Sequence, residues 1–383
     1  MKIASVRPVL LGYDTAGDPP LEWVGGRFAS WDAALVEVRL ESGATGLGEV
    51  AQGTMAAEAV AGLLDAFRRY LPSHDLPAVE LGDYLRDRTR FWARGGISSG
   101  VIAAIEIACL DAESKEAGIP LWQHLRGSAE GVPERVEVYA SGGLGTTPAQ
   151  VAQWNAEMEA AGHRTVKFRA MRDADTTIDL MREIVPKLAP TTRFCLDAVQ
   201  GCASTPWSLE DAVRVGHEAA ALGARWYEEP CAAEDHAGYA AVREAVDTDV
   251  TGVESHSVLE DFLHLIDVGG VDIAQPDLSM VGGWVQFRRV AEHAAAHGVG
   301  CVPHVWGSGV QLMTSLHAAI AAGLPLVEVC TLLNPMRDAT MAEPLKVVDG
   351  HVTVPTGPGS GGILPEGGEE QFPYRPGAGM VIR

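Results

Sequence analysis

Three acidic residues in the middle of this chain each close a short apolar run, and their spacing constrains the fold more than any other feature. They are Asp197, Glu228 and Glu254, separated by 31 and 26 residues, with a helix-like pattern between each pair. A strand, a crossover helix and two loops need about 30 residues, so each interval fits one strand-helix unit. In a parallel barrel, equivalent strand ends lie side by side on the face that carries the chemistry. We therefore expect the three carboxylates to converge.

Converging carboxylates repel one another, and some would stay protonated unless a cation joined them. A hard divalent cation with oxygen ligands, Mg²⁺ above all, removes this repulsion. Any one of these acids taken alone is better explained as a solvated loop residue or a helix N-cap. The agreement of all three with the strand period favours a metal site formed by Asp197, Glu228 and Glu254.

The part of the chain from residue 131 to residue 350 alternates between strand-like and helix-like patterns. Helical spacing is clearest at 148–161 and 284–295. This alternation predicts an α/β fold in which residues 131–350 form a barrel. The expected strands are 136–140, 165–168, 194–196, 226–227, 250–252, 272–274, 301–302 and 325–327.

Residues 1–130 have a different pattern, in which strands come first and helices follow. Alternating apolar and polar residues up to about residue 55, with turns expected at Gly43 and Gly46, predict an antiparallel meander. Three helices are expected at 56–70, 81–91 and 100–117, the last strongly apolar and hence buried. This order is typical of a separate α+β domain.

Two segments of the first domain and the end of the chain are rich in turn-forming residues. Residues 16–30, which contain Trp23, and residues 50–55 look irregular and are expected to form lids. Residues 351–383 are dense in Gly and Pro and are expected to join the first domain.

The composition excludes several functional classes. Acidic residues number 51 against 29 basic ones, a net charge of −22, which argues against nucleic acid and anionic membranes as partners. No apolar run is long enough to span a membrane. The six scattered cysteines resemble buried thiols of a cytoplasmic protein, and neither an HxH nor an HExxH pair indicates zinc. We expect a cytoplasmic homo-oligomer.

Charged residues also occur at or near the ends of the other predicted strands. These are Lys167, Arg169, Asp277, His304 and Glu328. A strand end with a purely structural role does not need acids and bases alternating on one face, so this pattern indicates a catalytic face.

Taken together, the motifs around these residues resemble the mandelate racemase subgroup of the enolase superfamily, within the mandelate racemase and muconate lactonizing enzyme family. The similarity extends over nearly the whole chain. The motifs are Lys167-Phe168-Arg169, Asp197-Ala198-Val199-Gln200-Gly201, Trp226-Tyr227-Glu228-Glu229-Pro230, Gly252-Val253-Glu254-Ser255, Gln275-Pro276-Asp277 and Pro303-His304-Val305-Trp306-Gly307-Ser308-Gly309.

The resemblance implies a modified TIM barrel, (β/α)₇β, with an N-terminal α+β capping domain. It also implies a Mg²⁺ site at the three carboxylates, a general-base pair formed by Asp277 and His304, and electrophilic roles for Lys167 and Glu328. The motifs Ala342-Glu343-Pro344-Leu345 and Gly357-Pro358-Gly359 look most like those of members that act on sugar acids or their lactones.

The function implied is abstraction of the α-proton of a hydroxylated carboxylate through an enediolate, followed by β-elimination, as in an acid-sugar dehydratase. The alternatives are a sugar-lactone cycloisomerase, a racemase or epimerase, or, in another class, an inactive homologue that binds metal and acid. Two positions depart from the family pattern. Arg169 stands where a second lysine base is common, and Val199 stands where Asn is common. A guanidinium binds carboxylates but does not readily accept a proton, which disfavours racemisation by two opposed bases.

Overall fold

The computed structural model describes residues 1–15, 21–23, 26–377 and 379–382, and within them eight short parallel strands alternate with seven helices. The strands are β6 (Arg135–Ser141), β7 (Thr165–Arg169), β8 (Arg193–Asp197), β9 (Tyr227–Glu228), β10 (Val250–Gly252), β11 (Ile273–Ala274), β12 (Gly300–Cys301) and β13 (Leu326–Cys330). The helices are α5 (Pro148–Ala160), α6 (Ala174–Ile184), α7 (Leu209–Ala221), α8 (His236–Ala245), α9 (Leu259–Asp267), α10 (Trp284–Ala296) and α11 (Gly309–Ala322). Each predicted strand is present, with ends that differ by up to three residues.

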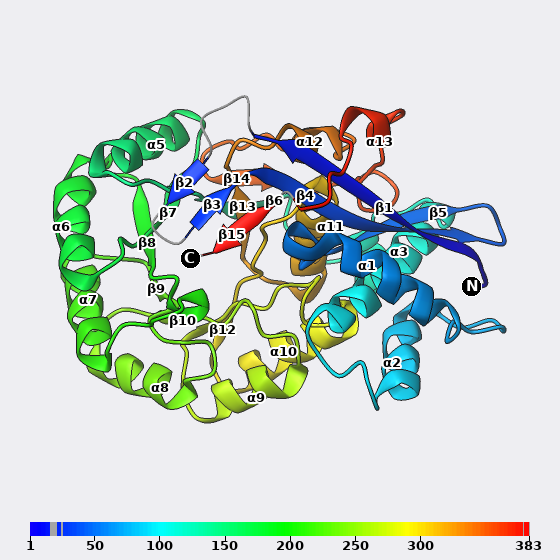
Figure 1. Cartoon of the computed structure of the whole chain (residues 1–383), viewed down its shortest axis with the longest axis horizontal. Helices are drawn as coiled ribbons and strands as arrows, with labels where there is room; N and C mark the ends of the chain where they lie inside the picture. The colour runs from blue at the N-terminus through cyan, green and yellow to red at the C-terminus, as the bar shows by residue number, and fades with distance from the viewer. Residues whose placement is uncertain (16–20, 24–25, 378, 383) are drawn as a thin grey trace.

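The parallel strands form a barrel because the last strand returns to the first. Neighbours follow chain order from β6 to β12, and β13 pairs in parallel with β6. At the junction between β12 and β13, the amide of Val305 donates to Glu328 Oε2 at 2.9 Å. Helices α5 to α10 follow one another around the outside (Figure 1). This is the predicted (β/α)₇β form of the TIM barrel.

Five of the seven barrel helices begin at a residue whose side chain caps the first turn, whereas α9 and α10 do not. In α6, the side chain of Asp173 accepts the amide of Thr176, and Ile178, Met181 and Ile184 are buried at three-residue spacing. The strands are buried on both faces, so charged residues inside them stand out. All five residues of β7 and of β13 are buried, including Lys167 and Glu328.

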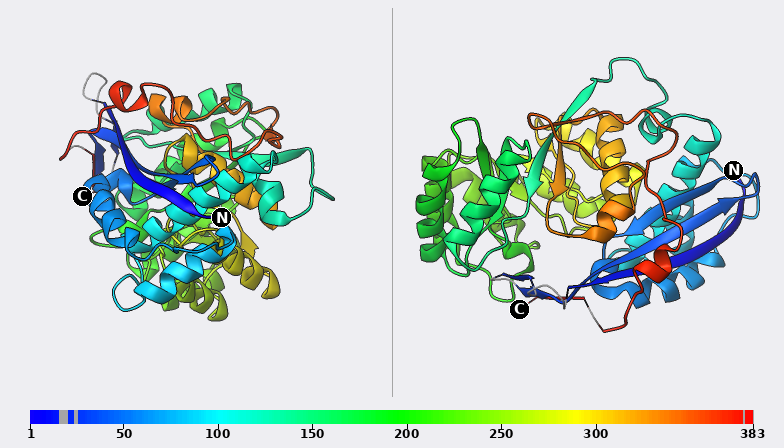
Figure 2. Two further views of the ribbon diagram at one scale, coloured as in Figure 1. Left: turned by 90° about the vertical axis from the view of Figure 1, so that its right-hand side faces the viewer. Right: turned by 90° about the horizontal axis from the view of Figure 1, so that it is seen from above.

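The N-terminal part of the chain forms a separate antiparallel sheet that lies beside the barrel (Figure 2). Its strands are β1 (Ile3–Asp14), β4 (Ser30–Leu40) and β5 (Thr45–Val50), paired in the order β1-β4-β5. Its helices are α1 (Gly53–Arg68), α2 (Ala78–Thr89), α3 (Ile97–Glu116) and α4 (Leu121–Arg126). The meander, the three predicted helices and the burial of α3 are confirmed; α4 was not predicted.

Gly46 does not form the predicted turn, because it lies inside β5. A Cβ atom on Gly46 would stand 1.9 Å from the carbonyl oxygen of Ala108, and one on Gly48 would stand 2.1 Å from that of Ala104. Both glycines therefore allow α3 to lie directly on β5. The turn itself is at Gly43, whose φ is +97°.

The first predicted lid is not irregular where the structure describes it. Residues 16–20, 24 and 25, and the side chain of Trp23, lie outside the described part, but β2 (Leu21–Trp23) and β3 (Gly26–Phe28) form a hairpin. Strand β15 (Met380–Ile382), from the other end of the chain, pairs with β3. This partner is more than 350 residues away in the sequence, so a local pattern could not predict it.

The second predicted lid is also ordered, because 50–55 comprises the end of β5, a short turn and the start of α1. Thr54 is buried and Met55 is half exposed. The C-terminal segment begins with β14 (His351–Thr353), which pairs with β6 of the barrel and not with the first domain. Directly after β14 the segment reaches the first domain, where Trp122 Nε1 donates to the carbonyl of Pro355 at 2.7 Å, and further on the amide of Gly12 donates to the carbonyl of Phe372 at 3.0 Å.

Three contacts fasten the N-terminal domain to barrel helices, and we call them the domain seam. Glu49 of β5 accepts the amide of Ser308 at 3.0 Å, at the start of α11. Glu106 of α3 accepts the amide of Val285 at 3.1 Å, in the first turn of α10. The amide of Trp122 in α4 donates to Nδ1 of His317 in α11 at 2.9 Å. Carboxylates suit such positions because helix N-termini present unpaired amides and positive potential.

The remaining elements are short. They are α12 (Pro335–Ala339), α13 (Gly368–Gln371) and the 3₁₀ turns η1 (Val185–Lys187) and η2 (Gln200–Cys202). Among the described residues no helix is both long and apolar enough to cross a membrane. Five of the six free cysteines are buried as expected, but Cys202 is exposed, because it lies in the turn η2 outside the strands.

Candidate active site

The charged residues predicted at the strand ends come together at one end of the barrel, which we call the barrel mouth. It contains Lys167 and Arg169 of β7, Asp197 of β8, Glu228 of β9, Glu254 after β10, Asp277 after β11, His304 after β12 and Glu328 of β13. One difference concerns Glu328, which lies in the middle of β13 because that strand continues to Cys330.

Asp197, Glu228 and Glu254 converge as their spacing predicted. Ligand oxygens of the three carboxylates all lie within 4.8 Å of one another. Oε2 of Glu254 is buried and has no hydrogen-bond partner among the described residues. A buried carboxylate oxygen without a donor costs free energy, and three oxygen donors around one point suit a hard divalent cation. The residues present therefore fit a magnesium ion.

Carboxylates outnumber cations in this region, and two of them are held by Lys167. Its ammonium group contacts Glu228 closely, lies 3.0 Å from Glu328 Oε1 and 3.8 Å from Asp197 Oδ2. Burial raises the pKa of Glu228 to about 7, and the nearby Asp197 and Glu254 add to the rise, against the opposing charge of Lys167. Burial likewise raises the pKa of Glu254. These directions are those of a site that stabilises anions poorly until a cation is present.

The backbone turns sharply where the three acids are placed. Val199, Glu229 and Val253 have φ values of 55°, 46° and 64°, in the left-handed region. Each lies within two residues of one of the three acids. Valine rarely adopts this conformation, because its branched side chain crowds the backbone. Such strain is found mostly at functional sites.

His304 and Asp277 form a buried pair beside the acids. Nδ1 of His304 lies 2.8 Å from Asp277 Oδ2, and Nε2 lies 3.3 Å from Glu254 Oε1. Because a carboxylate only accepts, Nδ1 carries a proton and Nε2 faces the mouth. Burial lowers the pKa of His304, but Glu254 and the hydrogen bond to Asp277 outweigh burial and raise it to about 10.

Arg169 is held in a fixed position at the edge of the mouth. Its Nε lies 3.1 Å from Asp197 Oδ2, and Nη1 donates to Ser141 Oγ at 2.9 Å and to the carbonyl of Gly142 at 3.2 Å. Its guanidinium carbon stands 5.2 Å from the ring centre of Trp306. Although burial disfavours the charged form, Asp197 and the other acids raise the pKa of Arg169 above its already high usual value.

A cavity of about 140 Å³ opens onto these groups. Arg169, Asp197, Glu254, Asp277 and His304 line its polar side, whereas Lys167, Glu228 and Glu328 lie beneath it and do not belong to its described lining. The cavity also has apolar lining residues from both domains, namely Met55, Leu144, Val199, Met280 and Trp306. The mouth can thus hold a small anion with an apolar face.

Sequence reasoning did not assign roles to several residues that support the site. Gln311 Nε2 donates to Asp277 Oδ2 at 2.7 Å, and Gln275 Nε2 donates to Glu228 Oε2 at 3.0 Å. The amide of Gln311 also donates to Glu49 of the domain seam at 3.1 Å. Gln275 directly precedes a recognised motif proline, but nothing in the sequence links residue 49 to residue 311.

Comparisons with known proteins cover both parts of the chain. Residues 149–381 match the family model described as enolase C-terminal domain-like. Residues 20–126 match that of the mandelate racemase / muconate lactonizing enzyme, N-terminal domain. These two ranges follow the division seen in the structure between the barrel and the antiparallel domain.

Similar proteins of known name have comparable length. The chain is 30% identical to D-galactarolactone cycloisomerase of Agrobacterium fabrum over 94% of this chain and 96% of the relative. It is 25% identical to arabinonate dehydratase of Saccharolobus solfataricus over 76% and 78%. The crystal structure of a racemase from Streptomyces coelicolor A3(2) with bound magnesium is 26% identical, with a TM-score of 0.82 over 97% of this chain and 98% of that one.

Proposed function

The chain belongs to the mandelate racemase and muconate lactonizing enzyme family of the enolase superfamily, and from this we propose that it removes the α-proton of a hydroxylated carboxylate and then expels a β-substituent. The observation that carries the proposal is the His304–Asp277 pair, whose Nε2 faces a cavity lined by Arg169 and Glu254. As a member of this family the protein is an enzyme, a lyase or an isomerase.

We assign the metal to Asp197, Glu228 and Glu254, whose oxygens converge and include the unpartnered Oε2 of Glu254. When bound there, Mg²⁺ would supply the positive charge that makes the α-proton acidic and offsets the charge of an enediolate. A cation held by Glu254 would offset the charge through which this carboxylate raises the pKa of His304.

His304 acts as the general base through Nε2. Asp277 accepts the proton of Nδ1 and so holds the ring in the tautomer whose lone pair points to the cavity. Gln311 fixes Asp277 in turn. After abstraction, the protonated His304 is the nearest acid and donates its proton to the leaving group, so one residue serves both halves of a β-elimination.

Arg169 binds the substrate carboxylate at the edge of the cavity, where its guanidinium is exposed to a ligand but fixed by Asp197 and Ser141. A guanidinium suits this role because it presents several donors in a plane. Lys167 and Glu328 are buried beneath the cavity, where the positive charge of the lysine offsets the negative charge of the glutamate. The positive charge of Lys167 stabilises the enediolate from below.

The leaving group decides between two reactions. Loss of a β-hydroxyl as water makes the enzyme an acid-sugar dehydratase, which we take as the first candidate. Departure or addition of a ring oxygen makes it a cycloisomerase of a sugar lactone or anhydro-sugar acid. Two observations favour this second candidate. The cavity walls at Met55, Leu144 and Met280 are apolar, and the cycloisomerase from Agrobacterium is 30% identical to this chain.

The proposal is tested with a library of aldonates, aldarates and their lactones, incubated with the enzyme and Mg²⁺ in D₂O and followed by NMR. Turnover with one class of substrate separates dehydration from cycloisomerisation. We expect deuterium to enter one α-epimer, because Arg169 on the opposite face keeps its proton. Deuterium in both epimers at comparable rates would mean that a second base acts there. No exchange with any acid would indicate the rival class, an inactive binder.

Two variants test the roles assigned to His304 and Arg169 in this experiment. His304→Asn should lose both exchange and turnover, because the amide cannot accept the α-proton. Arg169→Lys is expected to keep a positive charge in the cavity but to introduce a group that burial beside Mg²⁺ can bring to a working pKa. If Arg169→Lys exchanges the α-proton of the opposite epimer, the side chain at position 169 faces the side of the substrate opposite His304.

A further inference from the structure

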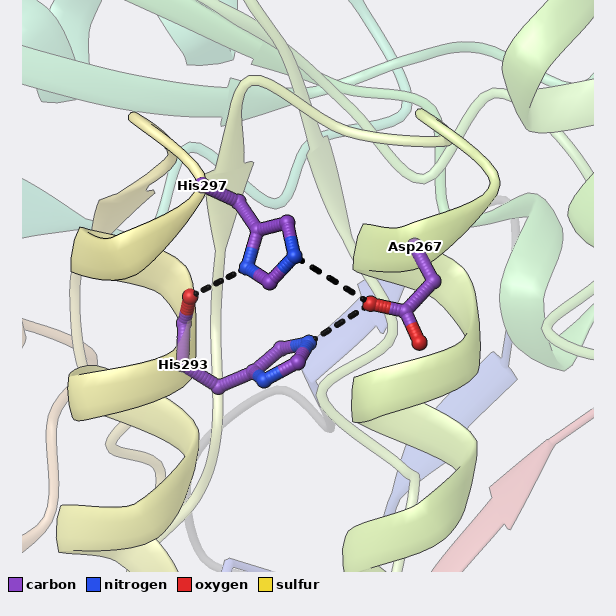
Figure 3. Close-up of side chains that lie close together, drawn as sticks. All are labelled: Asp267, His293 and His297. Carbon is purple, nitrogen blue, oxygen red and sulfur yellow. Dashed lines mark hydrogen bonds and ion pairs between the residues drawn. The ribbon is translucent and has the colours of Figure 1, made fainter.

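The ends of two neighbouring barrel helices hold a cluster of metal-ligating side chains that the reaction does not use. Asp267 is the last residue of α9, His293 lies in the last turn of α10, and His297 follows α10 (Figure 3). His293 Nε2 lies 2.7 Å from Asp267 Oδ1, and His297 Nε2 lies 3.6 Å from the same oxygen. Nitrogen and oxygen ligand atoms of all three lie within 4.8 Å of one another.

The hydrogen bond that His297 makes through Nδ1 leaves its other ring nitrogen, Nε2, able to bind a cation. Nδ1 of His297 lies 2.9 Å from the carbonyl oxygen of His293, so Nδ1 carries the proton of that bond. In the neutral ring, Nε2 then has a lone pair and faces a carboxylate oxygen that also only accepts. Two facing acceptors repel unless a proton or a metal ion lies between them. A hydrogen bond that fixes the tautomer in this way is typical of histidines that bind metals.

The surrounding backbone also favours a positive charge. Both α9 and α10 end at this point, and the C-terminal end of a helix carries a partial negative charge. The two histidines are four residues apart, one in the last turn of α10 and one at its C-terminal cap, and their ring centres are 4.2 Å apart. The side chains of Asp267, His293 and His297 are 52%, 25% and 44% exposed, so an ion can reach them from solvent.

We propose that Asp267, His293 and His297 bind a divalent transition metal of the zinc class, with water in the remaining position. Two imidazoles and one carboxylate are a common zinc ligand set, whereas Mg²⁺ prefers oxygen ligands alone. The two sites therefore differ in the metal that their ligands prefer, zinc at this site and magnesium at the barrel mouth. The metal would join α9 to α10 and act as a structural staple.

The location supports a structural and not a catalytic role. Helices α9 and α10 end just before β11 and β12 begin, so their ends lie at the opposite end of the barrel from the mouth. The signal in the sequence is His293-x₃-His297, which has the histidine spacing of HExxH but lacks its glutamate. It becomes informative only once residues 284–296 are known to be helical.

The test is zinc binding to the protein without a histidine tag and saturated with Mg²⁺, measured by isothermal titration calorimetry. We expect one equivalent of Zn²⁺ per chain, with affinity lowered at least about tenfold in His297→Ala and in Asp267→Asn. His74→Ala, which changes an exposed histidine of the other domain, should bind as the wild type does. Glu228→Gln should keep this equivalent, which separates it from metal held at the mouth.

Thermal unfolding supplies a second readout that does not depend on activity. Zinc should raise the midpoint in the wild type and in His74→Ala, because a ligand that binds only the folded chain stabilises it, and should not raise it in His297→Ala. The proposal is overturned if Mg²⁺-saturated protein takes up no zinc, or if His297→Ala and Asp267→Asn bind zinc as the wild type does.

Discussion

The barrel mouth and the domain seam both bury glutamates, but they treat the charge in different ways. Glu49 in the seam is surrounded by donors, since Ser308 gives it an amide and a hydroxyl and Gln311 gives it a second amide. Burial raises the pKa of Glu49 to about 7, and these hydrogen bonds oppose the rise. In the mouth, Glu254 keeps a buried oxygen without a donor.

This difference shows that burial of an acid does not by itself indicate function. The groups around it do. Glu49 and Glu106 accept amides at helix N-termini and so join the two domains, although Oε2 of Glu106 has no partner among the described residues. Asp197, Glu228 and Glu254 instead bring three carboxylates to one point, an arrangement that suits a cation. Substitutions in the mouth should therefore change the reaction with little loss of stability, and substitutions in the seam should do the reverse.

The largest expected effect is that of Glu228→Gln in the mouth. The amide removes one ligand charge, so turnover should fall by about 10³-fold or more. The fold should persist, because the change relieves repulsion with Asp197 and Glu254. Turnover, magnesium binding by calorimetry and the unfolding midpoint test this together, with the exposed Glu260→Gln as control. Full turnover of Glu228→Gln in the presence of a chelator would exclude the metal site.

The next effect is that of His304→Asn. Loss of a positioned general base should lower turnover by about 10² to 10⁴-fold. Magnesium binding and the unfolding midpoint should stay close to wild type, since the three carboxylates are unchanged. His74→Asn provides a control for histidine replacement. If His304→Asn keeps α-proton exchange, another residue is the base. If it unfolds, substitutions in the mouth lower stability as those in the seam do, and the two regions do not differ in this respect.

A pH experiment tests the seam through His317. Burial lowers the pKa of His317 to about 3, so below its unfolded value of about 6.5 the unfolded chain binds a proton that the folded chain does not. Stability is therefore full above about pH 6.5 and falls as the pH falls towards 3, by about 1.4 kcal/mol per unit. Replacement by Asn keeps an acceptor for the amide of Trp122 but cannot titrate.

The loss of stability between pH 7 and pH 5 should be about 2 kcal/mol smaller in His317→Asn than in the wild type. Denaturant unfolding at the two pH values measures it, and turnover at pH 7 should change little. The exposed His74→Asn is the control. Equal pH dependence in the two proteins would mean that His317 is not held neutral by the fold.

The smallest effect concerns strain in the mouth. Val199 has a φ of 55° and a ψ of 25°, a conformation that Asn adopts more easily than Val. Val199→Asn should stabilise the protein by about 1 kcal/mol and raise the unfolding midpoint by about 2 °C. Val348→Asn, an exposed valine at which no left-handed backbone is found, should give no gain. A loss of stability in Val199→Asn would indicate that packing of the valine outweighs its strain.

The sequence allowed the barrel and the mouth to be predicted because both depend on short-range regularities. A buried strand needs an apolar run, and a charged residue such as Asp197 or His304 at its end stands out by contrast. The seam could not be predicted in this way. Glu49 and Ser308 are 259 residues apart, and although Ser308 lies in a recognised motif, nothing in the local sequence of either residue indicates the other as its partner.

The same reason explains the errors in the first domain. The hairpin of β2 and β3 depends on β15 at the far end of the chain, so residues 16–30 look irregular when read alone. Gly46 looks like a turn residue because the need for space comes from α3, whose backbone lies against it. A residue chosen for a distant neighbour is misread when only its sequence neighbours are considered.

The close contact of β5 with α3 limits how the N-terminal domain can move relative to the barrel. Since Gly46 and Gly48 bring the two backbones together, the strand that carries Glu49 and the helix that carries Glu106 move as a single rigid body. This body is anchored at the first turns of two successive barrel helices, α10 and α11. Rotation of one domain away from the other would have to break these hydrogen bonds. Substrate can therefore enter with the seam intact only by displacement of chain that lies outside this body.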